Sequence, residues 1–157
     1  MHPRAAELIT RLQLEPHPEG GYYREIFRSG GLVTPADGRG PRAALTTIYF
    51  LLPAGTVSRW HRVSSDEVWH LYEGGPLEVL TVDPAYTRLS RHKLDAQAPV
   101  CTVAATYWQA ARTLGDYALA GCTVAPGFDF ADFTILADDA ATAARLLPLD
   151  ADLASML

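Results

Sequence analysis

The sequence predicts an all-β, mainly antiparallel protein with a short helix at each end. From Tyr22 to Leu136, short runs rich in Val, Ile, Thr, Tyr, Phe and Trp alternate with clusters of Gly, Pro and Asp, which is the pattern of strands joined by turns. The turns follow one another too closely for the helical crossovers that parallel strands need. A chain of 157 residues fits one compact domain, residues 1–157. These observations together favour a closed barrel or a two-sheet jelly roll.

The first predicted element is a helix over Pro3–Leu14. Ala5, Leu8, Ile9 and Leu12 recur at the spacing that places apolar side chains on one face of a helix. Nine strands are then expected, each bounded by turn residues: Tyr22–Arg28, Ala44–Leu52, Thr56–His61, Glu67–Tyr72, Leu77–Val82, Arg88–Leu94, Val100–Ala104, Tyr117–Val124 and Phe130–Leu136.

Two segments outside these strands have their own signals. Ser29–Pro41 is rich in Gly and Pro, carries few bulky apolar residues and is expected to be a long mobile loop. It lacks the Gly-Lys-Ser/Thr string of a phosphate-binding loop. The alanine-rich run Ala140–Leu147 has an Asp before it and Pro148 after it, so a C-terminal helix is expected there.

Composition and charge restrict the partners. The chain carries 13 Lys and Arg against 18 Asp and Glu, a formal charge of −5, so no concentrated basic face for a nucleic acid is expected. The densest apolar run, Ile48–Leu52, is far shorter than the ~20 residues of a membrane-spanning helix. Because the first residues resemble no secretory leader, we expect a cytoplasmic location. Cys101 and Cys122 lie in apolar, strand-like stretches and are expected to stay reduced.

The candidate chemistry lies around His61. The strings H-E-x-x-H, C-x-x-C and G-x-S-x-G are all absent. Instead, His61 and Val63 alternate along one predicted strand and therefore share a face, and Glu67 follows on the next strand. With Gly55 before them and Gly74 after them, these residues match most of a motif in which His-x-His and Glu line a small barrel, Val63 replacing the second His. Gln109 stands where a second motif would place its histidine.

Longer phrases sharpen this resemblance. They are HPEGGYYRE (17–25), SRWHRVSSDEVWHLYEG (58–74), YWQAAR (107–112) and GCTVAPGFDFADF (121–133). Taken together they make the chain resemble a cupin of the small uncharacterised cupin-5 family. The resemblance implies a double-stranded β-helix, or jelly-roll barrel, usually paired into a homodimer, with a small-molecule pocket in the barrel mouth. It implies no particular reaction.

In such a barrel His61 is a candidate base, and Glu67 is the candidate carboxylate that orients its imidazole. The alternative is a purely structural role, in which His61 and Glu67 form a hydrogen-bonded pair in the core. A general acid is expected opposite, and Tyr23, Tyr72 and Tyr107 are equally placed for it by spacing.

Further candidates for ligand binding are Gln109, Trp108, Arg24, Tyr23 and His70. Trp108 is a candidate stacking surface or a core residue. The guanidinium group of Arg24 is a candidate to bind an anionic group of the ligand. Alternatively, it pairs with a carboxylate at the edge of the pocket, such as that of Glu25. His70 follows Trp69 in the same predicted strand and therefore points to the opposite, outer face. It would reach the site only if a β-bulge changed the register.

No cofactor is certain. A divalent metal would use His61, Glu67 and Gln109, with His70 or water completing the shell, but Val63 offers no lone pair and an amide is a weak ligand.

The leading expectation is a binder of a small polar metabolite, a sugar or nucleotide-linked sugar, acting as a metal-free epimerase or isomerase by analogy with barrels that use a histidine base. A metal-dependent cupin dioxygenase or isomerase and a non-catalytic binding module are the alternatives.

Overall fold

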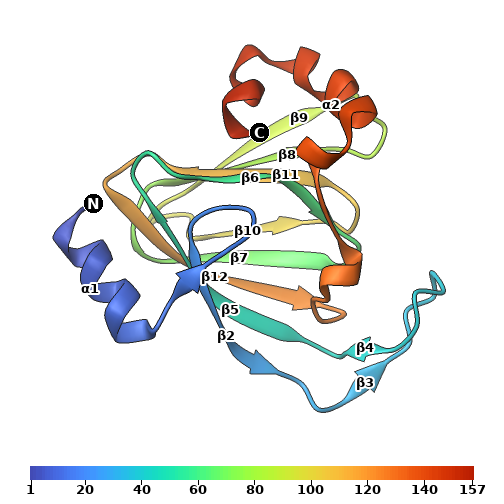
Figure 1. Cartoon of the computed structure of the whole chain (residues 1–157), viewed down its shortest axis with the longest axis horizontal. Helices are drawn as coiled ribbons and strands as arrows, with labels where there is room; N and C mark the ends of the chain where they lie inside the picture. The colour runs from blue at the N-terminus through green and yellow to red at the C-terminus, as the bar shows by residue number, and fades with distance from the viewer.

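Two antiparallel sheets stacked face to face form the body of the protein (Figure 1). The computed structural model describes residues 1–157. One sheet has the order β1-β2-β5-β12-β7-β10 and the other the order β13-β6-β11-β8-β9. The strands of the first are β1 (Glu15–Pro16), β2 (Tyr22–Arg28), β5 (Thr46–Pro53), β12 (Tyr117–Ala125), β7 (Asp66–Gly74) and β10 (Val100–Val103). Those of the second are β13 (Phe133–Ile135), β6 (Val57–Val63), β11 (Trp108–Thr113), β8 (Leu77–Val82) and β9 (Leu89–Leu94).

The main core lies between the two sheets. Phe50, Trp69, Leu77, Val79 and Leu94 are almost completely buried there. Alternate residues of each strand face this interior, as the pleat of a β-strand requires. The predicted all-β jelly-roll class is therefore confirmed, and the nine predicted strand regions all contain observed strands.

Both outer faces receive a cover from the ends of the chain. Helix α1 (Pro3–Leu12) packs Leu8 against Leu51 and Leu119 of the six-stranded sheet. The C-terminal segment, which contains α2 (Ala140–Leu146) and short 3₁₀ helices, covers the five-stranded sheet (Figure 1). Its Leu153 accepts a hydrogen bond at its carbonyl from Nε1 of buried Trp60, at 3.1 Å.

Helix α1 ends two residues earlier than predicted. Gln13 adopts a left-handed conformation (φ 54°), and its N–H group closes onto the carbonyls of the last helical turn. Leu14 then leaves the helix but still packs in the apolar cluster beneath α1. The apolar periodicity thus continues past the helix because the next residue contacts the same core.

Strand β11 was not among the predicted strands, although it is central in the five-stranded sheet. It pairs with β6 on one side and β8 on the other. Its sequence, WQAART, has two alanines and little β propensity. Burial between two neighbours overrides this weak local signal, because Trp108, Gln109, Ala110 and Ala111 are all buried.

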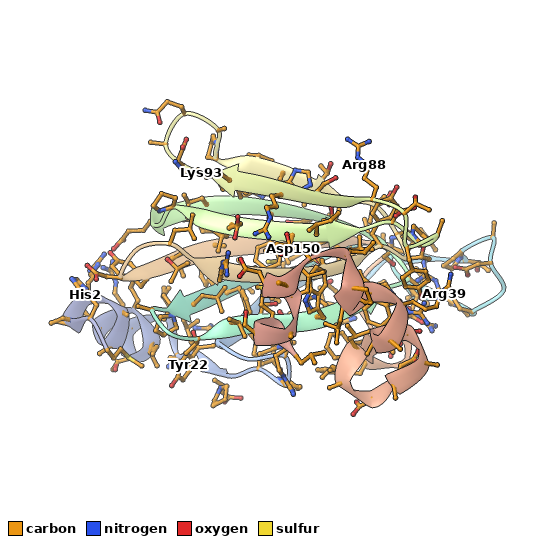
Figure 2. All side chains as sticks on the ribbon, turned by 90° about the horizontal axis from the view of Figure 1, so that it is seen from above. His2, Tyr22, Arg39, Arg88, Lys93 and Asp150 are labelled. Atoms are coloured by element: carbon orange, nitrogen blue, oxygen red, sulfur yellow. The ribbon has the colours of Figure 1, made fainter.

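Two other expectations need correction. The predicted loop Ser29–Pro41 contains β3 (Leu32–Val33), which pairs with β4 (Arg42–Ala43) just beyond it. Arg39 and Arg42 fasten this hairpin to Asp132, Arg42 through two contacts of 2.8 Å, and Figure 2 shows Arg39 at the end of the molecule opposite His2. The predicted strand Phe130–Leu136 is a strand only over Phe133–Ile135, between two 3₁₀ helices.

Cys101 and Cys122 are free thiols. Cys101 of β10 and Cys122 of β12 both pair with Trp69 of β7, one from each neighbouring strand. The two thiols are therefore about two strand spacings apart, ~9.5 Å. No helix of the chain combines the length and apolar character needed to cross a membrane.

Candidate functional site

An open cavity of about 320 Å³ enters the space between the two sheets. Its apolar lining includes Ile48, Val63, Val124, Phe128, Phe130 and Phe133. Its innermost polar groups are His17, Glu19, His61 and Glu67. Side chains from both sheets, from the β1–β2 turn and from the segment after β12 therefore meet at one place.

His61 and Val63 reach the cavity from the same face of β6, as their alternation predicts. His61 is only 3% exposed. Its Nδ1 lies 2.7 Å from the carbonyl oxygen of Arg59. Because a carbonyl only accepts, Nδ1 carries the hydrogen, and a neutral His61 presents its lone pair at Nε2. Burial lowers the pKa of His61, although the charge of Glu67 raises it, so the neutral form is favoured.

This geometry corrects one part of the predicted role of Glu67. The Arg59 carbonyl, not a carboxylate, sets the tautomer of His61. The carboxylate nearest to Nε2 is Glu19, whose Oε2 lies 3.3 Å away. Glu67 acts on His61 through its charge across the cavity.

Glu67 extends from β7 and is held by Gln109 of β11. Gln109 donates from Nε2 to Glu67 Oε2 at 2.6 Å and accepts at Oε1 from Trp69 Nε1 at 3.0 Å. The indole N–H only donates, so the amide can face in one direction only. Burial raises the pKa of Glu67, the charge of His61 lowers it, and the neighbouring Glu19 raises it.

Glu19 and His17 enter the site from the turn between β1 and β2. The turn folds over β6, where the N–H of Arg59 donates to the carbonyl of Glu19 at 2.8 Å. Ser58 donates from Oγ to Glu19 Oε1 at 2.7 Å. Burial raises the pKa of Glu19 to about 8 and lowers the pKa of His17 to about 4. Both side chains are therefore neutral near pH 7.

Neither His17 nor Glu19 was among the predicted site residues. Both stand in the phrase HPEGGYYRE, which carried part of the resemblance. The available signal was two ionisable residues within three positions before Gly20 and Gly21, where a tight turn precedes a strand. That signal indicates a turn and does not indicate which strand the turn will contact.

The other predicted site residues lie in different places. Tyr23 lines the cavity and meets His17 edge to face, with ring centroids 4.5 Å apart. Arg24 is outside it and donates to the carbonyl of Leu12 and to Oε1 of Gln13, both at 3.1 Å. It therefore serves the C-terminal end of α1, where a cation is favourable.

Trp108 and His70 also lie away from the cavity. Trp108 is fully buried under the C-terminal segment, with the guanidinium of Arg62 over its ring at 4.9 Å. Its neighbour Gln109 points to the opposite face of β11, as alternation requires. His70 stacks on Tyr72 at 6.4 Å, while Trp69 points into the core.

The mouth of the cavity carries one cation, Arg28, which is already paired. Glu25 binds it through two contacts of 2.7 and 3.0 Å, and Arg28 also donates to the carbonyl of Phe128. The wall beside it is aromatic, since Phe128, Phe130 and Phe133 pack edge to face on one another.

The predicted metal ligands do not fit a metal ion. Gln109 turns its amide nitrogen toward Glu67 and engages its oxygen with Trp69, so it has no lone pair free on that side. Val63 contributes none. No set of three His, Cys, Asp or Glu side chains is arranged so that it could hold a metal ion. His61 and Glu67 alone fall short of a shell of three or four protein ligands.

The jelly-roll barrel and its histidine-lined mouth define the chain as a cupin. It belongs to the family described as "Cupin superfamily (DUF985)", whose model matches residues 6–136. The chain is similar to a solved hypothetical protein of Leishmania major, with 34% identity, TM-score 0.82 and coverage of 97% of this chain and 96% of that one. A solved protein of Shewanella oneidensis is similar at 32% identity and TM-score 0.84, with the same coverage.

A more distant likeness concerns the fold alone. Oxalate decarboxylase from Bacillus subtilis shares 18% identity at TM-score 0.59, over 78% of this chain and 30% of that enzyme. No curated protein sequence matches the chain.

Proposed function

We propose that this protein binds a small, uncharged, polar metabolite of monosaccharide size and transfers a proton on it through His61. The observation that carries the proposal is a buried, neutral imidazole that lines an open cavity together with the buried carboxyl groups of Glu19 and Glu67. Perturbed titratable groups gathered in a concave site are typical of acid–base catalysts.

The size and lining of the cavity support this ligand class. A volume of about 320 Å³ lies at the small end of ligand pockets. The rings of Phe128, Phe130 and Phe133 offer apolar faces to the C–H groups of a sugar, while the carboxyl and imidazole groups opposite serve its hydroxyl groups. A polyhydroxylated ring matches both surfaces.

The charges favour an uncharged sugar over a nucleotide-linked one. Arg28, the one cation at the cavity, is neutralised by Glu25. A phosphate would therefore meet no free donor fork, and it would face the carboxylates of Glu67 and Asp129. Binding of a phosphate would require breaking the Arg28–Glu25 pair.

In the proposed reaction, His61 accepts a proton at Nε2. The Arg59 carbonyl stabilises the imidazolium by accepting from Nδ1, and the charge of Glu67 stabilises it across the cavity. Burial keeps His61 neutral before the reaction, as a base must be.

The test combines binding and turnover. Neutral aldoses and ketoses, the same sugars as phosphates, and nucleotide-linked sugars are compared by thermal shift and by NMR detection of product. We expect neutral sugars to raise the Tm most, and His61→Gln to lower turnover by about 100-fold or more while binding persists. His92→Ala, on β9 outside the cavity, is the matched control. Turnover that survives in His61→Gln would disprove the assigned role.

We further propose that two copies pair through the outer face of the six-stranded sheet. Ile26, Tyr72 and Val100 are each at least 40% exposed on strands of this sheet. Exposed apolar groups gathered on one face are typical of an interface. Helix α1 covers only one end of this face (Figure 1).

A further inference from the structure

Three acceptor atoms meet at the carboxyl group of Glu19. His61 Nε2 lies 3.3 Å and His17 Nδ1 lies 3.5 Å from Glu19 Oε2. His17 Nδ1 also accepts from the backbone N–H of Glu19 at 3.3 Å, so it carries no hydrogen. His61 carries its hydrogen on Nδ1, toward the Arg59 carbonyl.

This arrangement requires one additional proton. If Glu19 were ionised and both imidazoles were neutral, the lone pairs of Glu19 Oε2 and His61 Nε2 would face each other in a buried site with no hydrogen between them. Such unpaired acceptors are costly where water is scarce. The cost disappears if a proton lies on Glu19 Oε2 or on His61 Nε2. Only these two positions are available, because His17 Nδ1 is already occupied by the backbone N–H.

We propose that Glu19 is a second catalytic residue of this site, which shares a single proton with His61 and delivers it to an oxygen atom of the ligand. Ser58 holds Oε1 from β6 and so leaves Oε2 directed at the histidines. Glu19, His61 and Glu67 all line the same cavity, so a ligand can reach the shared proton directly.

The surroundings of Glu19 place the proton on its carboxyl group, because burial outweighs the groups that favour the ionised form. Burial has the largest effect and raises the pKa of Glu19 to about 8, whereas the Ser58 hydrogen bond and the charge of Arg59, both from β6, lower it. Glu67 of β7 is close enough for the charge of Glu19 to raise its pKa. Burial keeps His17 neutral, with its pKa lowered to about 4. At neutral pH the proton is therefore on Glu19, and His61 is neutral and retains the Nε2 lone pair that a base needs.

The pair defines a substrate class, an inference that rests on the proposed function. A carbonyl compound whose neighbouring carbon carries both a hydrogen and a hydroxyl group, such as the open-chain form of an aldose or ketose, uses both groups. The C–H bond breaks and its proton goes to His61 Nε2. The electron pair forms a C=C bond, and the carbonyl oxygen takes the proton of Glu19 to give an enediol. Glu19 is then a carboxylate and His61 an imidazolium, a close ion pair. The reverse transfers at the neighbouring carbon complete an isomerisation and restore both groups.

The first test reads the shared proton without any ligand. Between about pH 4.5 and 8, folded Glu19 holds a proton that unfolded Glu19 has lost. The free energy of unfolding therefore decreases as pH rises through this window. His17 has the opposite effect between about pH 4 and 6.5, but it is present in every variant. We expect Glu19→Gln to gain stability relative to the wild type from pH 6.5 to 9, measured by urea denaturation, whereas exposed Glu15→Gln keeps the wild-type profile.

A second variant, Ser58→Ala, keeps the test valid if Glu19→Gln does not fold. Ser58→Ala removes a hydrogen bond that favours the ionised carboxyl, so the loss of stability should move to higher pH. In parallel, the ¹⁵N signal of His61 Nε2 in the wild type should change as Glu19 ionises. Identical pH profiles for wild type, Glu19→Gln and Ser58→Ala would overturn the shared proton.

The second test concerns catalysis. On a sugar that the wild type converts, Glu19→Gln should lower turnover by about 100-fold or more. The fall in rate at high pH that reports the ionisation of Glu19 should also vanish. Full turnover in Glu19→Gln would overturn its catalytic role. A wild type that converts no aldose or ketose would overturn the proposed function and this role with it, while the stability profile would still establish the shared proton.

Discussion

At the residue scale, Gln109 connects the core to the candidate site. Its amide accepts from Trp69 and donates to Glu67, and all three side chains are buried. The position of the Glu67 carboxylate therefore depends on a core tryptophan that never reaches the cavity. A buried hydrogen-bond network of this kind is rigid because each member has one acceptable orientation.

Replacing Gln109 with Leu should destabilise the protein although the side chain is similar in size. The substitution leaves Trp69 Nε1 without an acceptor and Glu67 Oε2 without a donor, at about 1–3 kcal/mol for each buried group. Because the lost bond favours the ionised carboxyl, the pKa of Glu67 should rise further. Urea denaturation measures the loss. Gln97→Leu, in the exposed turn after β9, is the control and should behave as wild type. Equal stability of the two variants would contradict the bridging role.

At the element scale, the turn His17–Gly21 carries two of the four inner polar groups. Gly20 has φ 110° and Gly21 has φ 67°, conformations that favour glycine. A Cβ on Gly20 would also collide with the carbonyl oxygen of Val57 on β6. The absence of a side chain is what lets the turn lie flat on β6 and bring Glu19 to Ser58.

Although Gly20→Ala adds only one methyl group, it should lower the stability of the protein and displace the turn. We expect a loss of more than about 1 kcal/mol from the left-handed conformation alone, with an additional loss from the collision. Displacement of the turn should also weaken the Ser58–Glu19 contact and abolish the pH effect of Glu19 on stability. The control is Gly30→Ala, where an added Cβ meets nothing within 4 Å. A Gly20→Ala variant with wild-type stability and pH profile would show that the turn does not depend on this glycine.

At the scale of the whole molecule, the two sheets differ in how their outer faces are covered. The C-terminal segment buries Leu136, Leu146, Leu153 and Met156 on the five-stranded sheet. On the six-stranded sheet, α1 leaves Tyr72 and Ile26 exposed beside Tyr49. The uncovered face is the one through which we propose that two copies pair.

A charge at Tyr72 should separate such a dimer. We expect the wild type to sediment as a dimer at micromolar concentration and Tyr72→Glu as a monomer with an unchanged circular dichroism spectrum, because burial of an unpaired carboxylate is costly. Leu114→Glu, at the exposed turn between β11 and β12, should remain a dimer. A monomeric wild type, or a dimer that persists in Tyr72→Glu, would refute pairing through this face.

The sequence by itself determined nine strand regions, the fold class and the shared face of His61 and Val63. Each follows from a local property, the alternation of side chains along a strand and the turn residues that bound it. The family resemblance extended this to a barrel with a pocket, and the family and the fold are confirmed. Strand β11 was not predicted because its alanines have little β propensity. They are held in the sheet by pairing with β6 and β8.

Only the tertiary structure decided which polar groups meet. Glu19 reaches His61 because a turn 39 residues before Ser58 lies across β6, and Gln109 faces Glu67 with its nitrogen because Trp69 claims its oxygen. Arg24, Trp108 and His70 lie within the matched phrases of the sequence, but their side chains point away from the cavity. The physical reason is that alternation tells which side a residue faces within its own strand, whereas the contacts of a site depend on long-range pairing between strands and on the one hydrogen-bond arrangement that leaves no buried group unsatisfied.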